Sequence, residues 1–211
     1  MPTTRRAEQL RPRKRPVQAR SQRTVDAVLK AAAQVFASRG YAAGTTNHIA
    51  ERAGVSIGTL YEYFPNKDAL LVALMESHIH EGERVLQRAA VEMAGRTLGI
   101  RESVLHFVRA MVEFHAHERA LHRVLFEETP LPRRVQQTLA DLEQRVTEQV
   151  ELLIREADDV SVANPALTAA IVVQTVEGLT HKLVLHGGDE DVETFVAEIT
   201  RLVTSYLTTP S

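Results

Sequence analysis

Apolar residues recur every three or four positions along most of the chain, which is the spacing of helices that bury one face. Segments with this spacing are separated by turn signals, among them Gly40, Gly54, Gly99 and the pair Asn164–Pro165. No segment shows the sustained alternation of apolar and polar residues that is typical of a strand. The pattern therefore predicts an all-α fold of about nine helices. The expected helices cover residues 21–39, 45–52, 56–64, 66–93, 102–117, 120–127, 130–157 and 165–187, and a last one begins at 189.

Two of the predicted helices are short and are joined by a tight corner at residues 53–55. The hydroxyls of Thr45 and Ser56 can each cap the first N–H groups of the helix that follows. Gly54 stands where the chain must reverse, and glycine adopts positive φ without strain. This layout predicts a helix-turn-helix, whose second helix can enter the major groove of DNA. A helical hairpin inside an ordinary bundle is the alternative.

The second of these short helices has two different faces. Leu60 and Phe64 lie four residues apart and are expected to point inward, whereas Ile57, Thr59 and Tyr63 are expected to be more exposed. Gly58, in the first turn of this helix, lowers helix propensity but allows a phosphate or a base edge to come close.

Charge is distributed very unevenly over the 211 residues, although the net charge is only −2. Residues 1–67 hold 12 Lys/Arg and 4 Asp/Glu, whereas residues 68–211 hold 13 and 23. Much of the positive charge lies in residues 1–19, where prolines and like charges argue against a folded element. We expect a mobile basic arm there, with Arg15 near phosphates or in a minor groove; a solvated tail is the alternative.

The first 70 residues carry a dense set of motif positions. They resemble the DNA-binding domain of the tetracycline-repressor (TetR) family at Arg20, Ser21, Thr24, Ala31, Ala32, Phe36, Gly40, Tyr41, Thr46, Ile49, Ala50, Ala53, Gly54, Val55, Ser56, Gly58, Thr59, Leu60, Tyr61, Tyr63, Phe64, Lys67 and Leu70. The resemblance implies a DNA-binding domain at 20–67 and a helical ligand-binding and dimerisation domain at 68–211. It also implies a homodimeric repressor that binds a palindromic operator of double-stranded DNA and is released by a small apolar or aromatic ligand.

The same resemblance assigns DNA contacts by motif position. Thr46, Tyr61 and Lys67 are expected to hold phosphates, together with the helix N-termini at Thr45 and Ser56. Base edges are expected to meet Asn47, Ile57, Thr59 and Tyr63, where Asn47 suits adenine and Ile57 suits a thymine methyl group.

The helix at 165–187 is apolar on more than one side, which requires burial on both sides. Burial inside its own bundle is one explanation. The resemblance favours the other, in which the last two helices pair with their copies in a second subunit. The expected dimer residues are Leu167, Ile171, Gly178, Val196, Ile199 and Val203.

Apolar and polar residues of the acidic part of the chain are expected to form a small-molecule site. The expected ligand residues are Phe107, Met111, Phe114, His115, His122, Phe126, Leu142, Gln174 and His181. A filled core with histidines at its edge is the alternative.

Several functions lack the residues they need. The chain has no cysteine, and its i, i+2 histidine pairs diverge on a helix, so we expect no metal and no cofactor. No signal peptide and no membrane-spanning run is present, so a cytoplasmic protein is expected. No nucleophile motif or phosphate loop supports an enzyme, and a small helical enzyme remains a distant alternative. A DNA-binding architectural protein without a ligand is the nearer one.

Overall fold

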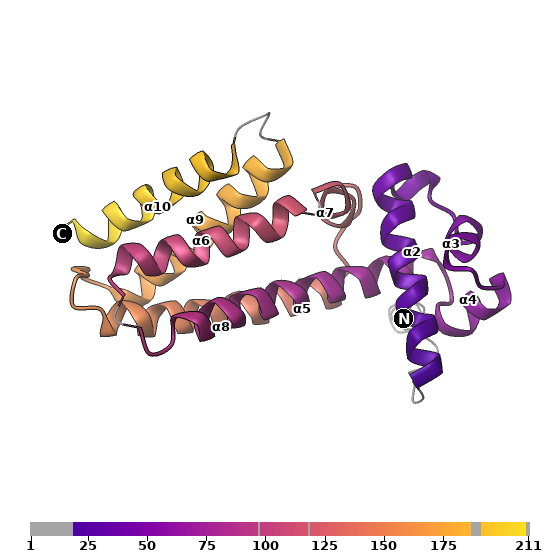
Figure 1. Ribbon diagram of the computed structural model, residues 1–211, viewed down its shortest axis with the longest axis horizontal. Coiled ribbons are helices and arrows are strands. Elements are labelled where there is room, and N and C mark those ends of the chain that lie inside the picture. Colours follow the sequence, from indigo (N-terminus) through magenta and orange to yellow (C-terminus); the bar gives the residue numbers. More distant parts are fainter. Residues whose placement is uncertain (1–18, 97, 118, 187–190, 210–211) are drawn as a thin grey trace, which may run out of the picture. The chain divides into compact units, whose positions relative to one another are not determined.

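The computed structural model describes residues 19–96, 98–117, 119–186 and 191–209 of the protein. Within these ranges it contains nine helices and no strand, which confirms the predicted fold class (Figure 1). Except for its last residue, the expected basic arm, with Arg15, lies outside the described residues. The helices are α2 (Ala19–Ala43), α3 (Thr46–Ala53), α4 (Ile57–Tyr63), α5 (Lys67–Met93), α6 (Ile100–His117), α7 (Arg119–Phe126), α8 (Arg133–Glu156), α9 (Pro165–His186) and α10 (Val192–Thr208).

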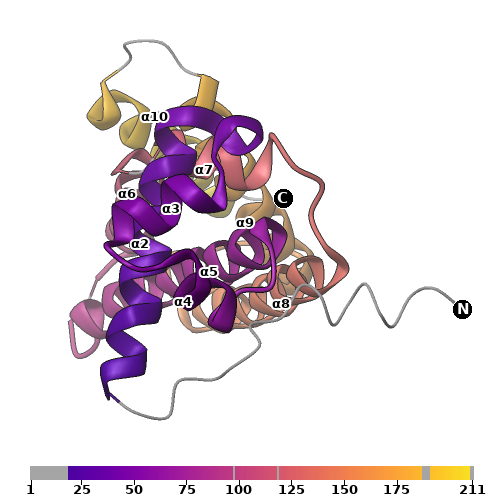
Figure 2. The ribbon, with the colours of Figure 1, turned by 90° about the vertical axis from the view of Figure 1, so that its right-hand side faces the viewer.

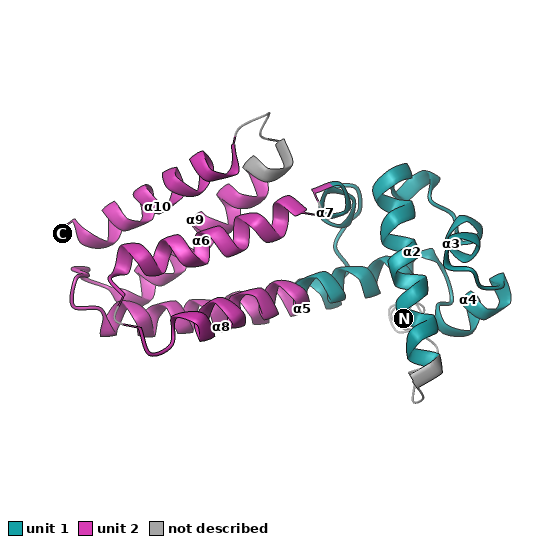
Figure 3. Ribbon diagram, viewed as in Figure 1, with its two compact units in different colours: residues 1–79, 120–136 teal, residues 80–119, 137–211 magenta. Residues whose placement is uncertain are grey.

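The chain divides into two compact units that are not contiguous in sequence (Figure 3). Unit 1 comprises Met1–Ile79 and Ala120–Gln136, and unit 2 comprises His80–Arg119 and Gln137–Ser211. The helix-turn-helix therefore shares its unit with the first half of α5, with α7 and with the start of α8.

In unit 1, α2 contacts α3, and α3 contacts α4, so that the three helices form one cluster (Figures 1 and 2). The apolar stripe of α2 is buried at Val28, Ala32 and Phe36, together with Ile49 of α3 and Leu60 of α4. Full burial of a Val, Phe, Ile or Leu side chain contributes about 1.5–3 kcal/mol. This packing anchors the buried face of α4 and leaves its opposite face exposed to solvent.

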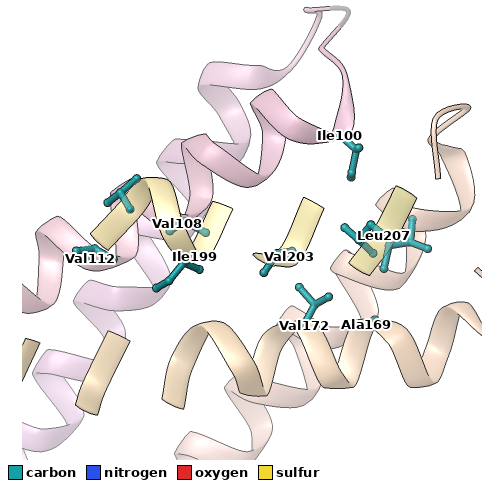
Figure 4. Close-up of a cluster of buried hydrophobic side chains, with 10 residues drawn as sticks. Ile100, Val108, Val112, Ala169, Val172, Ile199, Val203 and Leu207 are labelled. Atoms are coloured by element: carbon teal, nitrogen blue, oxygen red, sulfur yellow. The ribbon is translucent and has the colours of Figure 1, made fainter. Parts of the chain in front are cut away.

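In unit 2, α6 packs against α9 and α10, and α9 contacts α10. Buried side chains from these three helices meet in one apolar cluster (Figure 4). It includes Val108 and Val112 of α6, Val172 of α9, and Val203 and Leu207 of α10. The α8–α9 segment closes one end of the unit, since Ser161 N–H donates to the carbonyl oxygen of Leu207 at 3.1 Å.

None of the helices in the described part of the chain is long and apolar enough to cross a membrane.

Candidate nucleic-acid interface

The corner between α3 and α4 has the predicted caps. The Thr45 hydroxyl accepts a hydrogen bond from His48 N–H at 3.3 Å, and the Ser56 hydroxyl accepts one from Thr59 N–H at 3.0 Å. Gly54 has φ 67° and ψ 30°, the left-handed conformation that glycine adopts readily. The Val55 N–H then donates to the carbonyl oxygen of Ala50 at 3.0 Å, which satisfies one of the last carbonyls of α3. The sequence therefore specifies this helix-turn-helix locally.

One face of α4 is buried and the other is open to solvent. Leu60 and Phe64 are buried, as predicted. The exposed side presents Ile57, Gly58 and Tyr61, and Asn47 of α3 is exposed as well. These residues are accessible to solvent, whereas Thr59, also expected to be exposed, is half-buried.

Tyr63 does not belong to that exposed side, and its predicted exposure is wrong. Only 8% of this residue is accessible. Tyr63 follows Leu60 by three positions and precedes Phe64, and both of these residues are buried. Tyr63 therefore packs on the buried side of α4, away from the exposed residues of that helix.

Two residues expected to hold phosphates lie together. The hydroxyls of Thr46 in α3 and Tyr61 in α4 are 3.1 Å apart and form a hydrogen bond. This pair joins the first turn of α3 to the exposed face of α4. The shared hydrogen bond orders both hydroxyl groups.

Lys67, the third residue expected to hold a phosphate, makes contacts within unit 1. Its ammonium group donates to the carbonyl oxygens of Tyr41 at 2.7 Å and Ala42 at 3.4 Å. It also lies 4.1 Å from the centre of the Tyr41 ring. The Tyr41 hydroxyl in turn donates to the carboxylate of Asp68. Burial raises the pKa of Tyr41, and the hydrogen bond and charge of Asp68 raise it further. The spacing of these residues in the sequence does not indicate this cluster.

The structure gives Gly58 no internal reason to be glycine. It does not have a positive φ, since among the described residues only Gly40, Gly54 and Gly95 do. A Cβ atom at Gly58 would meet the Ser56 hydroxyl at 3.6 Å, which is an ordinary contact. The open space beside it faces solvent.

The expected ligand residues are divided between the units. Phe107, Met111, Phe114 and His115 lie on α6, Leu142 on α8, and Gln174 and His181 on α9, all in unit 2. His122 and Phe126 lie on α7 in unit 1, where their rings are 4.7 Å apart.

Two of the predicted ligand histidines are neighbours in unit 2. The rings of His115 and His181 lie 4.7 Å apart, and His115 Nδ1 is 2.7 Å from the carbonyl oxygen of Met111. Burial lowers the pKa of His115. Burial, followed by the charge of His115, lowers the pKa of His181 to about 4. The neutral form of both rings is therefore favoured near pH 7.

An open groove of about 510 Å³ lies between α5 and α6 in unit 2. Most of its lining side chains are ionisable, including Arg88, Glu92 and Arg109. Of the predicted ligand residues in the described part of the chain, Phe114 alone lines this groove. Its charged lining differs from the apolar site that the sequence predicts.

The six expected dimer residues separate into two groups. Leu167, Ile171 and Gly178 on α9 are exposed, and nothing lies within 4 Å of a Cβ atom built on Gly178. Val196, Ile199 and Val203 on α10 are buried in the core of unit 2. Their side chains are already covered within the subunit, so they are not available to a partner.

The large apolar side chains that α10 exposes are those of Leu202 and Tyr206. They follow each other by four positions, so they lie on one face of the helix. Leu167 and Leu202 have accessible fractions of 57% and 49%. Together with Ile171, these side chains give α9 and α10 an apolar outer surface.

Comparisons with known proteins agree with the helix-turn-helix. The profile described as "Bacterial regulatory proteins, tetR family" matches residues 28–74, and the profile "Tetracyclin repressor-like, C-terminal domain" matches residues 100–207. UidR of Escherichia coli K12, an HTH-type transcriptional regulator, is 27% identical over 183 residues, which cover 83% of this chain and 87% of UidR. YvkB of Bacillus subtilis is 28% identical over 125 residues, or 54% of this chain, and the match spans only 62% of the length of YvkB.

The fold also agrees with solved structures. A crystal structure of a regulatory protein of the TetR family from Rhodococcus RHA1 superposes with a TM-score of 0.69 at 22% identity, over 89% of this chain and 98% of that one. At this identity the likeness concerns the fold. The C-terminal profile alone covers half of the chain, and the N-terminal profile covers the helix-turn-helix derived above. The chain therefore belongs to the TetR family of bacterial regulatory proteins.

Proposed function

We propose that this protein is a sequence-specific transcriptional repressor that binds a palindromic operator as a homodimer. The observation that carries this proposal is the exposed face of α4. The opposite face is anchored in the core by the buried side chains of Leu60 and Phe64. It is backed by the capped corner and by the basic N-terminal part of the sequence. Asn47, Ile57 and Thr59 would meet base edges, and the Thr46–Tyr61 pair would hold a phosphate.

The proposed dimer uses the outer face of α9 and α10. Leu167 and Ile171 of α9 and Leu202 and Tyr206 of α10 would be covered by the same residues of a second subunit. Gly178 would let the two copies of α9 approach closely. A two-fold dimer presents two α4 helices, which matches half-sites about 34 Å apart on a palindrome.

The proposed effector is a small, largely uncharged molecule with apolar or aromatic character. Phe107, Met111 and Phe114 recur along one side of α6, and the nearby imidazoles of His115 and His181 are neutral near pH 7. Apolar side chains with a few polar groups among them are typical of small-molecule sites. To release the operator, the effector must bind the released state more tightly by a few kcal/mol.

We further propose that the protein acts in the cytoplasm and catalyses no reaction. The family consists of regulators, and its DNA target requires access to the chromosome. An architectural DNA-binding protein without an effector is the competing function. The two differ in one measurable property, since only a regulator with a small-molecule site will show a melting temperature that depends on a small ligand.

The function is tested by selecting duplexes from a random-sequence library with the purified, ligand-free protein. A repressor of this kind is expected to enrich a palindrome whose half-sites lie about one helical turn apart, with affinity that falls steeply with salt. Native mass spectrometry of the purified protein then identifies a co-purified effector. Failure to bind any duplex in a salt-sensitive way would refute the proposed function.

A further inference from the structure

Helix α2 is interrupted just before the helix-turn-helix begins. Gly40 has φ 73° and ψ 169°, a conformation that is essentially restricted to glycine. The chain resumes as a single turn, in which Gly44 N–H donates to the carbonyl oxygen of Gly40 at 3.1 Å. Thr45, the cap of α3, follows directly. The 40–44 turn therefore determines where α3 starts.

A carboxylate from a distant segment caps this turn. The N–H of Tyr41, the first after the break, donates to Glu128 Oε2 at 2.9 Å. The cap residue of a helical turn usually accepts from the second or third N–H group through its own side chain, but Gly40 has no side chain. A Cβ atom on Gly40 would lie 3.2 Å from Glu128 Oε2. Glu128 thus satisfies the first N–H group of a turn whose cap residue has no side chain.

The opposite end of the turn is held by the start of α5. Lys67 binds the carbonyl oxygens of Tyr41 and Ala42, and the carboxylate of Asp68 accepts from the Tyr41 hydroxyl. The turn is thus fixed by a carboxylate at its N–H end and by an ammonium group at its carbonyl end. All of these residues belong to unit 1.

Glu128 lies between α7 and α8, and the C-terminal family profile spans its position. By sequence it is part of the C-terminal domain, whereas by contacts it belongs to the unit of the helix-turn-helix. A movement of the α7–α8 segment would therefore act directly on the Tyr41 N–H group.

We propose that Glu128 is a positioning residue for operator binding, which holds the start of the helix-turn-helix by capping Tyr41. A rearrangement of the α7–α8 segment removes this cap, and the affinity for DNA falls as a result. The inference rests on the proposed DNA binding and extends it with a residue that touches no DNA.

Charge and position make opposite predictions for this residue. A carboxylate on a DNA-binding unit repels phosphates, so its removal would tighten binding if charge alone mattered. If the cap positions α3, its removal weakens binding instead. Glu127 and Glu128 are adjacent, both exposed and of the same charge, so removal of Glu127 changes the charge equally and leaves the hydrogen bond from Tyr41 N–H to Glu128 in place.

The test compares full-length wild-type protein with Glu128→Ala, Glu128→Gln, Glu128→Asp and Glu127→Ala. Fluorescence anisotropy measures the affinity for a duplex selected by the wild-type protein and for a random duplex of equal length. Glu128→Ala is expected to weaken specific binding roughly fivefold per subunit, the equivalent of a helix cap worth about 1 kcal/mol. Glu128→Gln keeps an acceptor and should stay within about twofold of the wild type, as should Glu127→Ala.

Glu128→Asp keeps the charge but shortens the side chain by one methylene, so it should weaken binding as well. It also serves as the milder variant if Glu128→Ala does not fold. Hydrogen exchange of the 40–46 segment in DNA-free protein should accelerate in Glu128→Ala and not in Glu127→Ala. Unchanged or tighter specific binding by both Glu128→Ala and Glu128→Asp would overturn the inference. Equal weakening by Glu128→Gln and Glu128→Ala would do so too. If the wild-type protein selects no duplex, the proposed function itself fails.

Discussion

Gly58→Ala separates what the protein needs for its own stability from what it needs for DNA binding. The substitution adds one methyl group in the first turn of α4. Within the chain that methyl group would meet only the Ser56 hydroxyl, at 3.6 Å, so no clash opposes it. Alanine is more favourable than glycine in a helix by about 0.8–1.0 kcal/mol, and somewhat less near an end. The free energy of unfolding should therefore rise by about 0.5–1 kcal/mol.

The expected effect on DNA binding has the opposite sign. If the backbone at Gly58 lies against a phosphate or a base edge, the methyl group occupies that contact in both subunits of a dimer. A loss of about 1 kcal/mol per subunit becomes about 2 kcal/mol for the dimer, which is roughly a 30-fold weaker affinity. Thermal unfolding followed by circular dichroism should show a melting temperature about 1–4 °C higher. Anisotropy on the selected duplex should show the weaker binding in the same preparation.

Either half of this prediction can fail on its own. A more stable variant with wild-type affinity would mean that Gly58 does not lie close to DNA. A less stable variant would mean that the added methyl group clashes with atoms of the chain itself. In both cases the assignment of the exposed face of α4 would need to change.

Three further predictions concern the interior and the assembly. Gly44→Ala places a Cβ atom 2.7 Å from the Phe36 ring. The free energy of unfolding, measured by urea denaturation, should fall by about 1–3 kcal/mol, and a fall of less than about 0.5 kcal/mol would contradict this prediction. Burial, and then the neighbouring imidazole of His115, lower the pKa of His181 from its ordinary 6.5 to about 4. On acidification the unfolded state therefore binds the proton first, so the folded protein loses stability as the pH falls from 6.5 towards 4. His181→Gln should flatten this dependence, and identical urea midpoints in both proteins at every pH from 7 to 4 would refute that. Ile171→Glu should shift sedimentation from dimer to monomer, whereas Leu152→Glu, an exposed apolar position on α8, should not.

The helix-turn-helix was predictable because its determinants are local. Thr45 and Ser56 act on N–H groups three residues away, and Gly54 needs only its own backbone conformation. The burial of Tyr63 is less local. Tyr63 and Ile57 both lie three positions from the buried Leu60, yet Tyr63 is buried and Ile57 is exposed. Spacing from one inward residue therefore does not decide which side of so short a helix is buried.

Helix α10 shows a limit of the sequence pattern. Its apolar residues occupy two faces, one with Val196 and Val203 and the other with Leu202 and Tyr206. Periodicity identifies both faces but does not state which one packs inside the subunit. That choice depends on α6, which contacts the first face and covers it. The packing of helices distant in sequence therefore decides that Leu202 and Tyr206 stay exposed.

The contacts around Tyr41 show a second limit. Glu128 lies 87 residues further along the chain than the N–H group that it caps, and Lys67 lies 26 residues beyond the carbonyl that it binds. No sequence pattern predicts which charged side chain contacts which backbone group at such separations. The motif position of Lys67 indicated a phosphate contact, whereas the structure gives its ammonium group two carbonyl partners. Loss of DNA affinity in a Lys67 variant would therefore not by itself identify a phosphate contact.

The same contacts bear on what counts as the DNA-binding part of this protein. The sequence predicts a boundary at residues 67 and 68, but the unit that holds the helix-turn-helix also includes residues 68–79 and 120–136. A fragment that ended at residue 67 would lack Asp68 and Glu128, and with them two of the three side chains that hold Tyr41. The 40–44 turn would then lose its cap, and the start of α3 would be free to move. Because the residue that supplies this cap lies between α7 and α8, the helix-turn-helix and the segment positioned to control it form one structural unit.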